Sequence, residues 1–499
     1  MNKIGATLIL AVAWTAALAQ TNPPAGRAMS LQDCFAAALK NNFDVRVERY
    51  EPQKSLLNLH AAYAGYDPTF TLAGEHTHNN AGFTTGVLGT FPSISDANSL
   101  NSGLGGLLPW GMGYDLTGNV TENYGQNYPS GPASTGQFDS SSGRVGVSVT
   151  QPLLNGFWID ATRLTISAAK NNLKLSEQSL RSQLITTVTA VENAYYELIY
   201  ARENVKVQQQ ALDLAQTQLD QDKQRVQVGS LAPLDVQQDE AQVAQNRANL
   251  IAAQNTLSVD QNALKNLITD QYLQWHDSDI QPLATLDATR QPLDVQDSWS
   301  KGMTLRPDLL QAKLNLEQQG IQLRYDRNQI FPSLDLTASY GYNGAGREFS
   351  DAFGQYATAN RPYYSYGAQF SVPLSNARAR NAYKSDKATE QQLLLKLKQL
   401  EQNVLVQIDN AVKAAQSAWE GSEATKQARI YAEAALDAEQ KKYAVGKSTT
   451  FTVLQLQNNL TSARSQEIRA LANYNQALAN LAQQEGSTLQ RRNLAIEAK

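Results

Sequence analysis

Few residues of this 499-residue chain have the type and spacing that a chemical reaction requires. His76 and His78 lie two positions apart and would share one face of a strand, where two imidazoles could hold a metal ion. The nearest further ligand, Glu75, would point to the opposite face, so we expect no metal site. Cys34, the single cysteine, lies among apolar residues at helical spacing and is expected to be packed rather than reactive.

The composition excludes several classes of protein. One cysteine allows no intramolecular disulfide, and the sequence has no G-x-S-x-G, no H-E-x-x-H and no P-loop. With 42 basic and 46 acidic residues, the formal net charge of -4 gives no basic face for a nucleic acid. We therefore expect no enzyme, no cofactor and no nucleic-acid partner.

The N-terminus has the pattern of an export signal. Residues 1–19 contain Lys3, an apolar run over 4–18 and the small-residue pattern Ala17-Leu18-Ala19. The next residue is Gln20 rather than cysteine, so no lipid anchor is expected there. No later stretch reaches 18 consecutive apolar residues. The mature protein should be periplasmic, secreted, or a barrel in the outer membrane.

The remaining sequence contains two copies of one plan. Residues 42–45 and 66–69 match 306–309 and 330–333 at an offset of 264. Farther along, 149–153 matches 370–374 at an offset of 221, and 228–238 matches 445–455 at an offset of 217. The ordered series of matches indicates an internal duplication. The drop from 264 to 221 places 43 additional residues in the first copy.

Each copy should consist of a helix, a strand pair, a very long helix, a sharp turn and another helix. We assign the first repeat to 20–270, a linker or equatorial segment to 271–299, the second repeat to 300–486 and a C-terminal tail to 487–499. Apolar residues at steps of 3, 4 or 7 predict long coiled-coil helices. In the first copy the predicted helices are 30–66, 159–228 and 233–270, and in the second 300–330, 377–445 and 449–486. The helix over 159–228 would be about 105 Å long.

The strand segments alternate between apolar and polar residues, which suits a half-buried sheet in water or a membrane barrel. One face of residues 333–342 carries Leu334, Leu336 and Tyr340, and the other carries Asp335 and Ser339. A Gly/Ser/Asn-rich segment over 79–143 is either a long loop or, because 113–123 alternates weakly, an additional strand pair. Four strands cannot close a barrel, and an open edge is not viable in lipid. The chain should therefore share a barrel with copies of itself, with eight strands for two chains or twelve for three.

The segments that carry a family resemblance, in order along the duplicated plan, are residues 38–42, 151–156 and 305–309 and the two Val-Gly turns. Over essentially the whole mature chain, the sequence resembles the TolC family of outer-membrane efflux and secretion channels. The resemblance implies a mainly helical protein with membrane β-structure. Long antiparallel hairpins would form an α-barrel, and a twelve-stranded transmembrane β-barrel would be shared between three chains. It also implies a homotrimer in the outer membrane of a Gram-negative bacterium, embedded in lipid with a periplasmic helical tunnel. The homotrimer would be the passive exit duct of a tripartite efflux or type I secretion system, with a periplasmic adaptor and an inner-membrane transporter as partners.

The resemblance also implies a gate at the periplasmic turns. The family's closing aspartate and tyrosine match Asp235 and Tyr443, so loss of either residue should loosen the closed entrance. The family's arginine is Ser448 here, and its two entrance aspartates are Thr452 and Gln455. These departures argue against the acidic ring and against a strong cation preference. For Asp235 the alternative is a helix-start carboxylate, and for Tyr443 it is packing between helices.

Two further sets of residues are candidates for contacts outside the chain. The turns at Gly229, Leu231, Gly446 and Lys447 would dock the adaptor, as the resemblance implies. Aromatic residues at the strand ends would lie at the membrane interface, with core packing as the alternative: Phe157, Trp158, Tyr363 and Tyr364. The rival function is an exported coiled-coil scaffold or adhesin without a pore, which would have no need of two alternating strand pairs.

Overall fold

The computed structural model describes residues 26–130 and 136–494, so the predicted export signal lies outside the described residues. The chain divides into two compact units. The strand unit comprises Val47–Gln183 and Trp299–Gln407. The hairpin unit comprises the described residues of Met1–Arg46, Leu184–Ser298 and Ile408–Ala495. Two helices, α4 (Ala161–Gln227) and α10 (Ala377–Ala444), contribute residues to both units.

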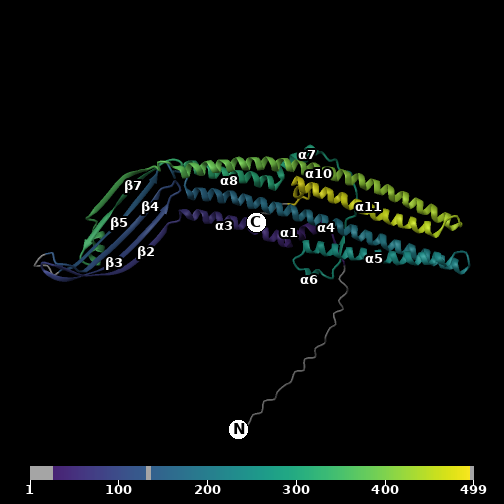
Figure 1. Ribbon diagram of the computed structural model, residues 1–499, viewed down its shortest axis with the longest axis horizontal. Helices are drawn as coiled ribbons and strands as arrows, with labels where there is room; N and C mark the ends of the chain where they lie inside the picture. Colours follow the sequence, from purple (N-terminus) through teal and green to yellow (C-terminus); the bar gives the residue numbers. More distant parts are fainter. Residues whose placement is uncertain (1–25, 131–135, 495–499) are drawn as a thin grey trace, which may run out of the picture. The chain divides into compact units, whose positions relative to one another are not determined.

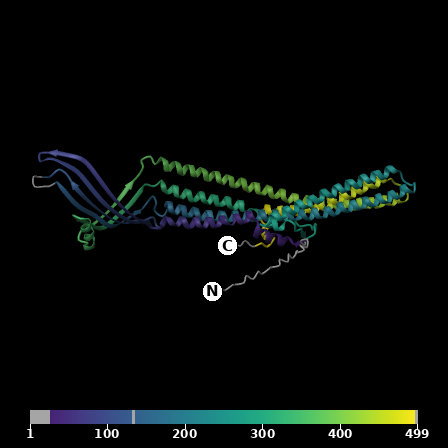
Figure 2. The ribbon, with the colours of Figure 1, turned by 90° about the horizontal axis from the view of Figure 1, so that it is seen from below.

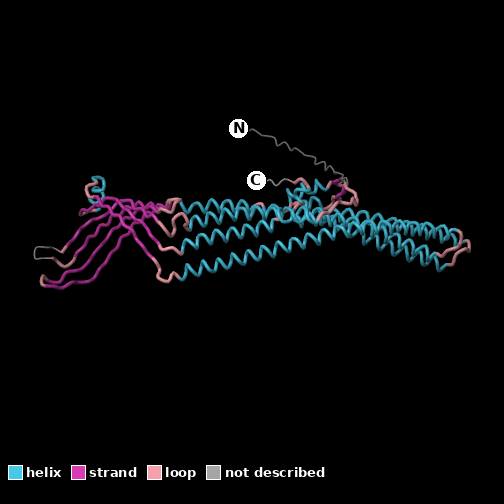
Figure 3. The backbone as a smooth tube through the Cα atoms, turned by 90° about the horizontal axis from the view of Figure 1, so that it is seen from above, coloured by secondary structure: helices cyan, strands magenta, loops and turns pink. Residues whose placement is uncertain are grey.

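The strand unit contains one six-stranded antiparallel sheet (Figures 1 and 3). Its strands follow the chain order across the sheet: β2 (Thr69–Gly86), β3 (Gly89–Leu107), β4 (Gly113–Gln126), β5 (Gln137–Pro152), β7 (Ser333–Gly346) and β8 (Pro362–Ser371). Within the described residues, β2 and β8 each pair with a single neighbour. The sheet is therefore open at both edges.

The sheet corrects the prediction for the glycine-rich segment. The alternative of a long loop over 79–143 is wrong, because β3 and β4 lie within it and pair over fourteen positions. Glycines allow close approach here: a Cβ on Gly105 would lie 2.4 Å from the Asp115 carboxylate on the neighbouring strand. Glycine, serine and asparagine have low strand propensity, which hides these strands from a pattern search. In the described residues this sheet therefore has six strands per chain, not four.

The two faces of the sheet differ across all six strands. One row of cross-strand neighbours is wholly apolar or aromatic: Phe70, Leu104, Leu116, Val147, Tyr340 and Tyr364. The adjacent row, which points to the opposite face, contains Thr69, Gly105, Asp115, Ser148, Ser339 and Ser365. Phe70 and Tyr364, at the two edges, are 66% and 75% exposed. The alternation predicted for 333–342 is thus part of a face that continues across the sheet.

Two predicted helices are divided in the structure. The segment 30–66 forms α1 (Leu31–Asn41), α2 (Phe43–Glu48), α3 (Tyr50–Tyr63) and a 3-10 turn, η1 (Ala64–Tyr66). The break falls at Asn42, whose side-chain oxygen accepts from the backbone N–H of Asp44 and Val45 and so restarts the helix. The segment 300–330 forms α7 (Val295–Leu305) and α8 (Pro307–Gln329), because Pro307 has no N–H to continue a helix.

The hairpin unit contains two antiparallel pairs, α4 with α5 (Pro233–Ile268) and α10 with α11 (Thr450–Glu485), as Figures 1 and 2 show. These bounds agree with the predicted 159–228, 233–270, 377–445 and 449–486 to within a few residues. Many apolar positions of the repeat in α4 are buried, among them Leu184, Val188, Val191, Tyr195 and Leu198. Burial of such a repeating apolar stripe is what stabilises a long helical pair.

Short elements complete the hairpin unit. β1 (Arg27–Met29) pairs in parallel with β6 (Ile280–Pro282), and the Tyr195 hydroxyl donates to the Met29 carbonyl at 3.1 Å. α6 (Tyr272–Trp275) and α12 (Thr488–Arg491) are single turns. Among residues 26–130 and 136–494, no helix is both long and apolar enough to cross a bilayer.

Candidate functional site

Each hairpin reverses at a glycine with positive φ. Gly229 has φ +75° and Gly446 has φ +73°, a conformation that favours glycine. In both turns the following N–H bonds back into the helix: Ser230 N–H donates to Arg225 at 2.8 Å and Lys447 N–H to Lys442 at 2.9 Å. These are the bonds of a Schellman turn. The two turns therefore have one geometry, which positions the side chains near them in equivalent ways.

A buried hydrogen-bond cluster joins the two hairpins near these turns. The Tyr443 hydroxyl, on α10, lies 2.8 Å from both carboxylate oxygens of Asp222, on α4, and 2.9 Å from the Thr450 hydroxyl, on α11. Gln218 donates to the same carboxylate at 2.7 Å. The Arg225 guanidinium lies 3.5 Å from Asp222 and 4.5 Å from the centre of the Tyr443 ring. Asp222 is fully buried, so these groups replace the water that a free carboxylate would bind.

A second aspartate is buried beside the first. Asp239, on α5, is fully buried, and within the part of the chain that the structure describes neither of its oxygens accepts from an N–H or O–H donor. The pKa of Asp239 is raised from 3.8 to about 7, chiefly because the carboxyl group is buried. The charge of Asp222, a side-chain hydrogen bond between Asp239 and Asp222, and the charge of Asp235 raise this pKa further. Two neighbouring buried carboxylates disfavour a second negative charge. Asp239 can therefore hold a proton near neutral pH and donate it to Asp222.

Asp235 lies near the buried cluster and is not among the hydrogen-bond partners found for Tyr443 in the described residues. It is half-buried in the first turn of α5, and within the described residues no hydrogen bond joins it to Tyr443. Ser448 donates to Glu439 at 2.6 Å, Thr452 pairs with the Thr449 hydroxyl at 3.0 Å, and Gln455 is exposed. The structure thus brings Tyr443 into a buried cluster and leaves the other candidates at its edge.

Sequence reasoning missed Asp222 and Asp239, although a signal was present. Leu219 and Val226 keep the apolar repeat, and Asp222 occupies the position three residues after the first and four before the second. Asp239 occupies the equivalent kind of position seven residues before the buried Asn246. A carboxylate at a core position of a coiled coil indicates a specific partner, because an unpaired buried charge is costly.

The predicted interface aromatics do not all share one face. Phe157 and Trp158 follow β5, are 39% and 50% exposed, and pack edge to face with centroids 5.9 Å apart. Tyr364 belongs to the apolar row of the sheet. Tyr363 points to the opposite face, where its ring lies 4.3 Å from the Arg144 guanidinium.

The turn candidates Gly229, Gly446 and Lys447 are exposed, and Leu231 is half-buried.

The residues with reactive side chains have structural partners. His76 and His78 contact Asn98 and Asp96 at 2.8 and 2.6 Å, and no group of three or more metal ligands occurs in the described residues. Cys34 is fully buried, and burial raises the pKa of its thiol to about 12. Its burial in α1 confirms the prediction that this cysteine is packed.

An antiparallel sheet crossed by an apolar row, together with two long helical hairpins, is the combination expected of an outer-membrane channel protein. The chain belongs to the outer membrane efflux protein family, whose sequence model matches residues 115–269 and 303–487. It is an outer-membrane efflux channel of the TolC type, located in the outer membrane of Gram-negative bacteria. The relatives are channel proteins, in agreement with the expectation that the chain is not an enzyme.

Two curated relatives illustrate the similarity. Outer membrane protein TolC of Escherichia coli K12 is 26% identical over 399 residues, which cover 77% of this chain and 74% of that protein. Pyoverdine export outer membrane protein OpmQ of Pseudomonas aeruginosa is 25% identical over 322 residues, covering 63% and 64%.

Solved structures share the fold. The Campylobacter jejuni CmeC outer membrane channel has a TM-score of 0.65 at 15% identity and covers 92% of this chain and 86% of its own. The open state of the Neisseria gonorrhoeae MtrE outer membrane channel has a TM-score of 0.64 at 17% identity and covers 92% and 89%.

Proposed function

We propose that three copies of the chain form the passive exit duct of a tripartite efflux or type I secretion system. The open sheet, with an apolar row that crosses all six strands, carries this proposal. An unpaired edge is not tolerated in lipid, so β2 of one copy must pair with β8 of another. Six strands per chain give eighteen for three copies, rather than the twelve expected from four strands. Eighteen is within the range of known bacterial barrels.

The hairpins would supply the periplasmic part of the duct. A 67-residue α4 is about 100 Å long, and together with α10 it can line a tunnel beneath the barrel. The turns at Gly229, Leu231, Gly446 and Lys447 would dock a periplasmic adaptor, which connects the duct to an inner-membrane transporter. The chain itself would then supply the sealed path, and the transporter the energy.

The buried cluster near the turns would hold the entrance closed. Tyr443 and Asp222 lie on different hairpins, so the entrance cannot widen by separating the hairpins without breaking their hydrogen bond. Breaking it would deprive a buried carboxylate of one of its donors, at a cost of about 1–3 kcal/mol. Asp235, Ser448, Thr452 and Gln455 lie near the same turns and are the residues available for links to neighbouring copies.

The experiment is to add detergent-purified protein to a planar lipid bilayer and to measure its mass in the same preparation. A trimeric mass with discrete, long-lived conductance steps is the expected result. A water-soluble species that leaves the bilayer unchanged would exclude the channel and favour the exported scaffold or adhesin. The Tyr443→Phe variant should be measured in parallel, because it distinguishes a shut entrance from the absence of a pore.

A further inference from the structure

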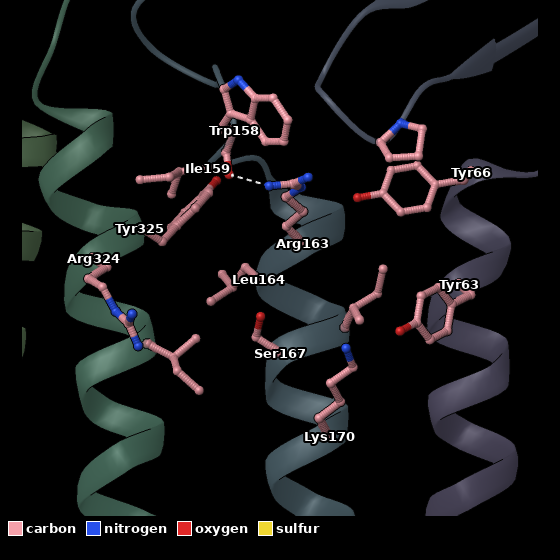
Figure 4. Close-up of a pocket in the computed structure, with 13 residues that line it drawn as sticks. Tyr63, Tyr66, Trp158, Ile159, Arg163, Leu164, Ser167, Lys170, Arg324 and Tyr325 are labelled. Carbon is pink, nitrogen blue, oxygen red and sulfur yellow. Dashed lines mark hydrogen bonds between the residues drawn. The ribbon is translucent and has the colours of Figure 1, made fainter.

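A cavity of about 530 Å³ lies in the strand unit between α3, α4 and α8 (Figure 4). Three cationic side chains line it: Arg163 and Lys170 from α4, and Arg324 from α8. In Figure 4, Arg163 lies beside Trp158, Lys170 projects toward Tyr63, and Arg324 lies along its own helix, α8. Apolar side chains such as Leu164 complete the wall.

The three cations have no carboxylate partner. In residues 26–130 and 136–494, none of them forms an ion pair within 4.0 Å. Arg324 donates to its own helix, at the Gly320 carbonyl, and Lys170 lies 5.7 Å from the centre of the Tyr63 ring. One carboxylate is near: Asp160 accepts from the Arg163 backbone N–H at 2.8 Å. The cavity is therefore rich in positive charge and is lined by no acidic residue.

The wall at Trp158 is held in a strained conformation. Trp158 has φ +56°, which is rare for a residue with a bulky side chain. The Arg163 guanidinium donates to the Trp158 carbonyl at 3.2 Å and lies 4.6 Å from the indole centre. Strained residues persist where the surroundings fix them, and they are frequent at ligand sites. Arg163 and Trp158 thus form a preformed corner with a cation and an aromatic ring.

The cavity lies at the ends of the strands. Tyr66 is three residues before β2, Trp158 is six residues after β5, and Arg324 is nine residues before β7. In the proposed function the strands cross the membrane, so their ends mark the level of the lipid headgroups. Headgroups occupy about 5–7 Å on each side of the hydrocarbon core. Aromatic and basic residues are the side chains that meet lipid phosphates at this level.

We propose that this cavity binds the phosphate-bearing headgroup of an anionic glycerophospholipid from the periplasmic leaflet of the outer membrane. The guanidinium of Arg163 and the charges of Lys170 and Arg324 would bind the phosphate oxygens. The aromatic wall and Leu164 would pack against the glycerol and the first part of the acyl chains. The inference rests on the proposed function only in taking the sheet as the membrane-spanning part.

The test is native mass spectrometry of the detergent-purified protein titrated with phosphatidylglycerol. The protein should bind phosphatidylglycerol more tightly than phosphatidylcholine, and an Arg163→Gln/Lys170→Gln/Arg324→Gln variant should bind it about tenfold more weakly or worse. The control variant, Lys387→Gln/Lys396→Gln/Lys398→Gln, removes three exposed lysines of α10 in the same unit and should bind as the parent does. An equal loss in both triple variants would overturn the site.

Two further measurements separate the alternatives. Excess inorganic phosphate should leave the bound lipid in place, and displacement by phosphate alone would mean a free-anion site instead. Lys170 is exposed, so Lys170→Gln should fold even where the triple variant does not; it should weaken binding several-fold, and Lys170→Arg should restore it. Bilayer conductance of Lys170→Gln should equal that of the parent. Failure of both proteins to conduct would contradict the channel and not the lipid site.

Discussion

The hydroxyl of Tyr443 lies 2.8 Å from both oxygens of Asp222, and the two residues belong to different helical hairpins, 221 positions apart in sequence. Both side chains are buried, so their hydrogen bond is made away from water. A charged hydrogen bond in such surroundings is stronger than its equivalent at the surface. In the two repeats predicted from sequence, the second supplies the donor and the first supplies the acceptor.

Removing the hydroxyl should weaken the closed entrance. We expect Tyr443→Phe to shift the closed-to-open equilibrium by about 1–3 kcal/mol per chain, or about 5- to 150-fold, because Asp222 loses one of its hydrogen-bond donors. The measurement is open probability and conductance in a planar bilayer. Tyr431→Phe, on the same helix but 69% exposed, is the matched control and should leave both unchanged. Equal behaviour of the two variants would contradict the role of Tyr443.

Asp235 and Tyr443 should act independently. Within the described residues they share no hydrogen bond, so any contribution of Asp235 to closure would come from another contact. We expect Asp235→Ala and Tyr443→Phe each to raise conductance, with additive effects in the double variant. A double-mutant cycle in bilayers checks this. Strong non-additivity would mean that the two residues pair in the assembled trimer.

The closed turns should be most stable below neutral pH. The native pKa of Asp239 is raised to about 7, so the folded chain holds a proton that the unfolded chain releases above about pH 4. The resulting stability is present at acidic pH and is lost as the pH rises through 7. Ionised Asp239 would face Asp222 and Asp235, while Arg225 lies beside Asp222.

Hydrogen exchange across residues 218–239 measures this effect. After correction for the chemical exchange rate, protection in the parent should fall as the pH rises from about 4 to 7 and should then level off. Asp239→Asn is neutral at every pH and should show no such fall. The same pH dependence in the parent and in Asp239→Asn would rule out Asp239 as the titrating group.

The two faces of the sheet should respond differently to charge. Val147 lies in the apolar row, and Ser148, the next residue, points to the polar face. We expect Val147→Arg to destabilise the membrane-embedded protein by about 2–4 kcal/mol at mid-depth, and Ser148→Arg to be tolerated. Urea unfolding in lipid bilayers compares the two. Equal destabilisation would argue against lipid on the apolar face.

Cys34 should be inaccessible in the folded protein. It is fully buried with a thiol pKa raised to about 12, so the reactive thiolate is scarce and shielded. We expect maleimide at pH 8 to label it only after unfolding. Position 447 is exposed, so the cysteine of the Lys447→Cys variant, in a Cys34→Ser background, should react with maleimide within minutes. Rapid labelling of native Cys34 would show that α1 opens.

Long helices could be predicted closely from sequence, and short-range breaks could not. The apolar repeat places α4 and α10 within a few residues of the predicted bounds, since a coiled coil requires that repeat along its whole length. The interruption at Asn42 depends on one side chain that bonds two backbone N–H groups. The periodicity of apolar residues does not predict a helix break of this kind.

The strands and the buried cluster show the same contrast. β3 and β4 are stabilised by hydrogen bonds to neighbouring strands, so their glycine-rich sequences carry little propensity of their own. Tyr443 is singled out by the resemblance to the TolC family, whereas its partner Asp222 is fixed by packing between hairpins. The presence of a polar residue at a core position is explained by its tertiary hydrogen bonds, which the local sequence does not reveal.

The two open edges of the sheet differ in length. β2 has 18 residues and β8 has 10, so in the proposed trimer they can meet over at most ten residues. About eight residues of β2, beginning near the register shift between Asn80 and Phe83, extend past the end of β8, and in the described residues β3 is the strand that pairs with them. At about 3.3 Å per residue they reach roughly 26 Å farther. Intact cells would therefore present three projecting β-hairpin tips, which antibodies and proteases could reach before the rest of the protein.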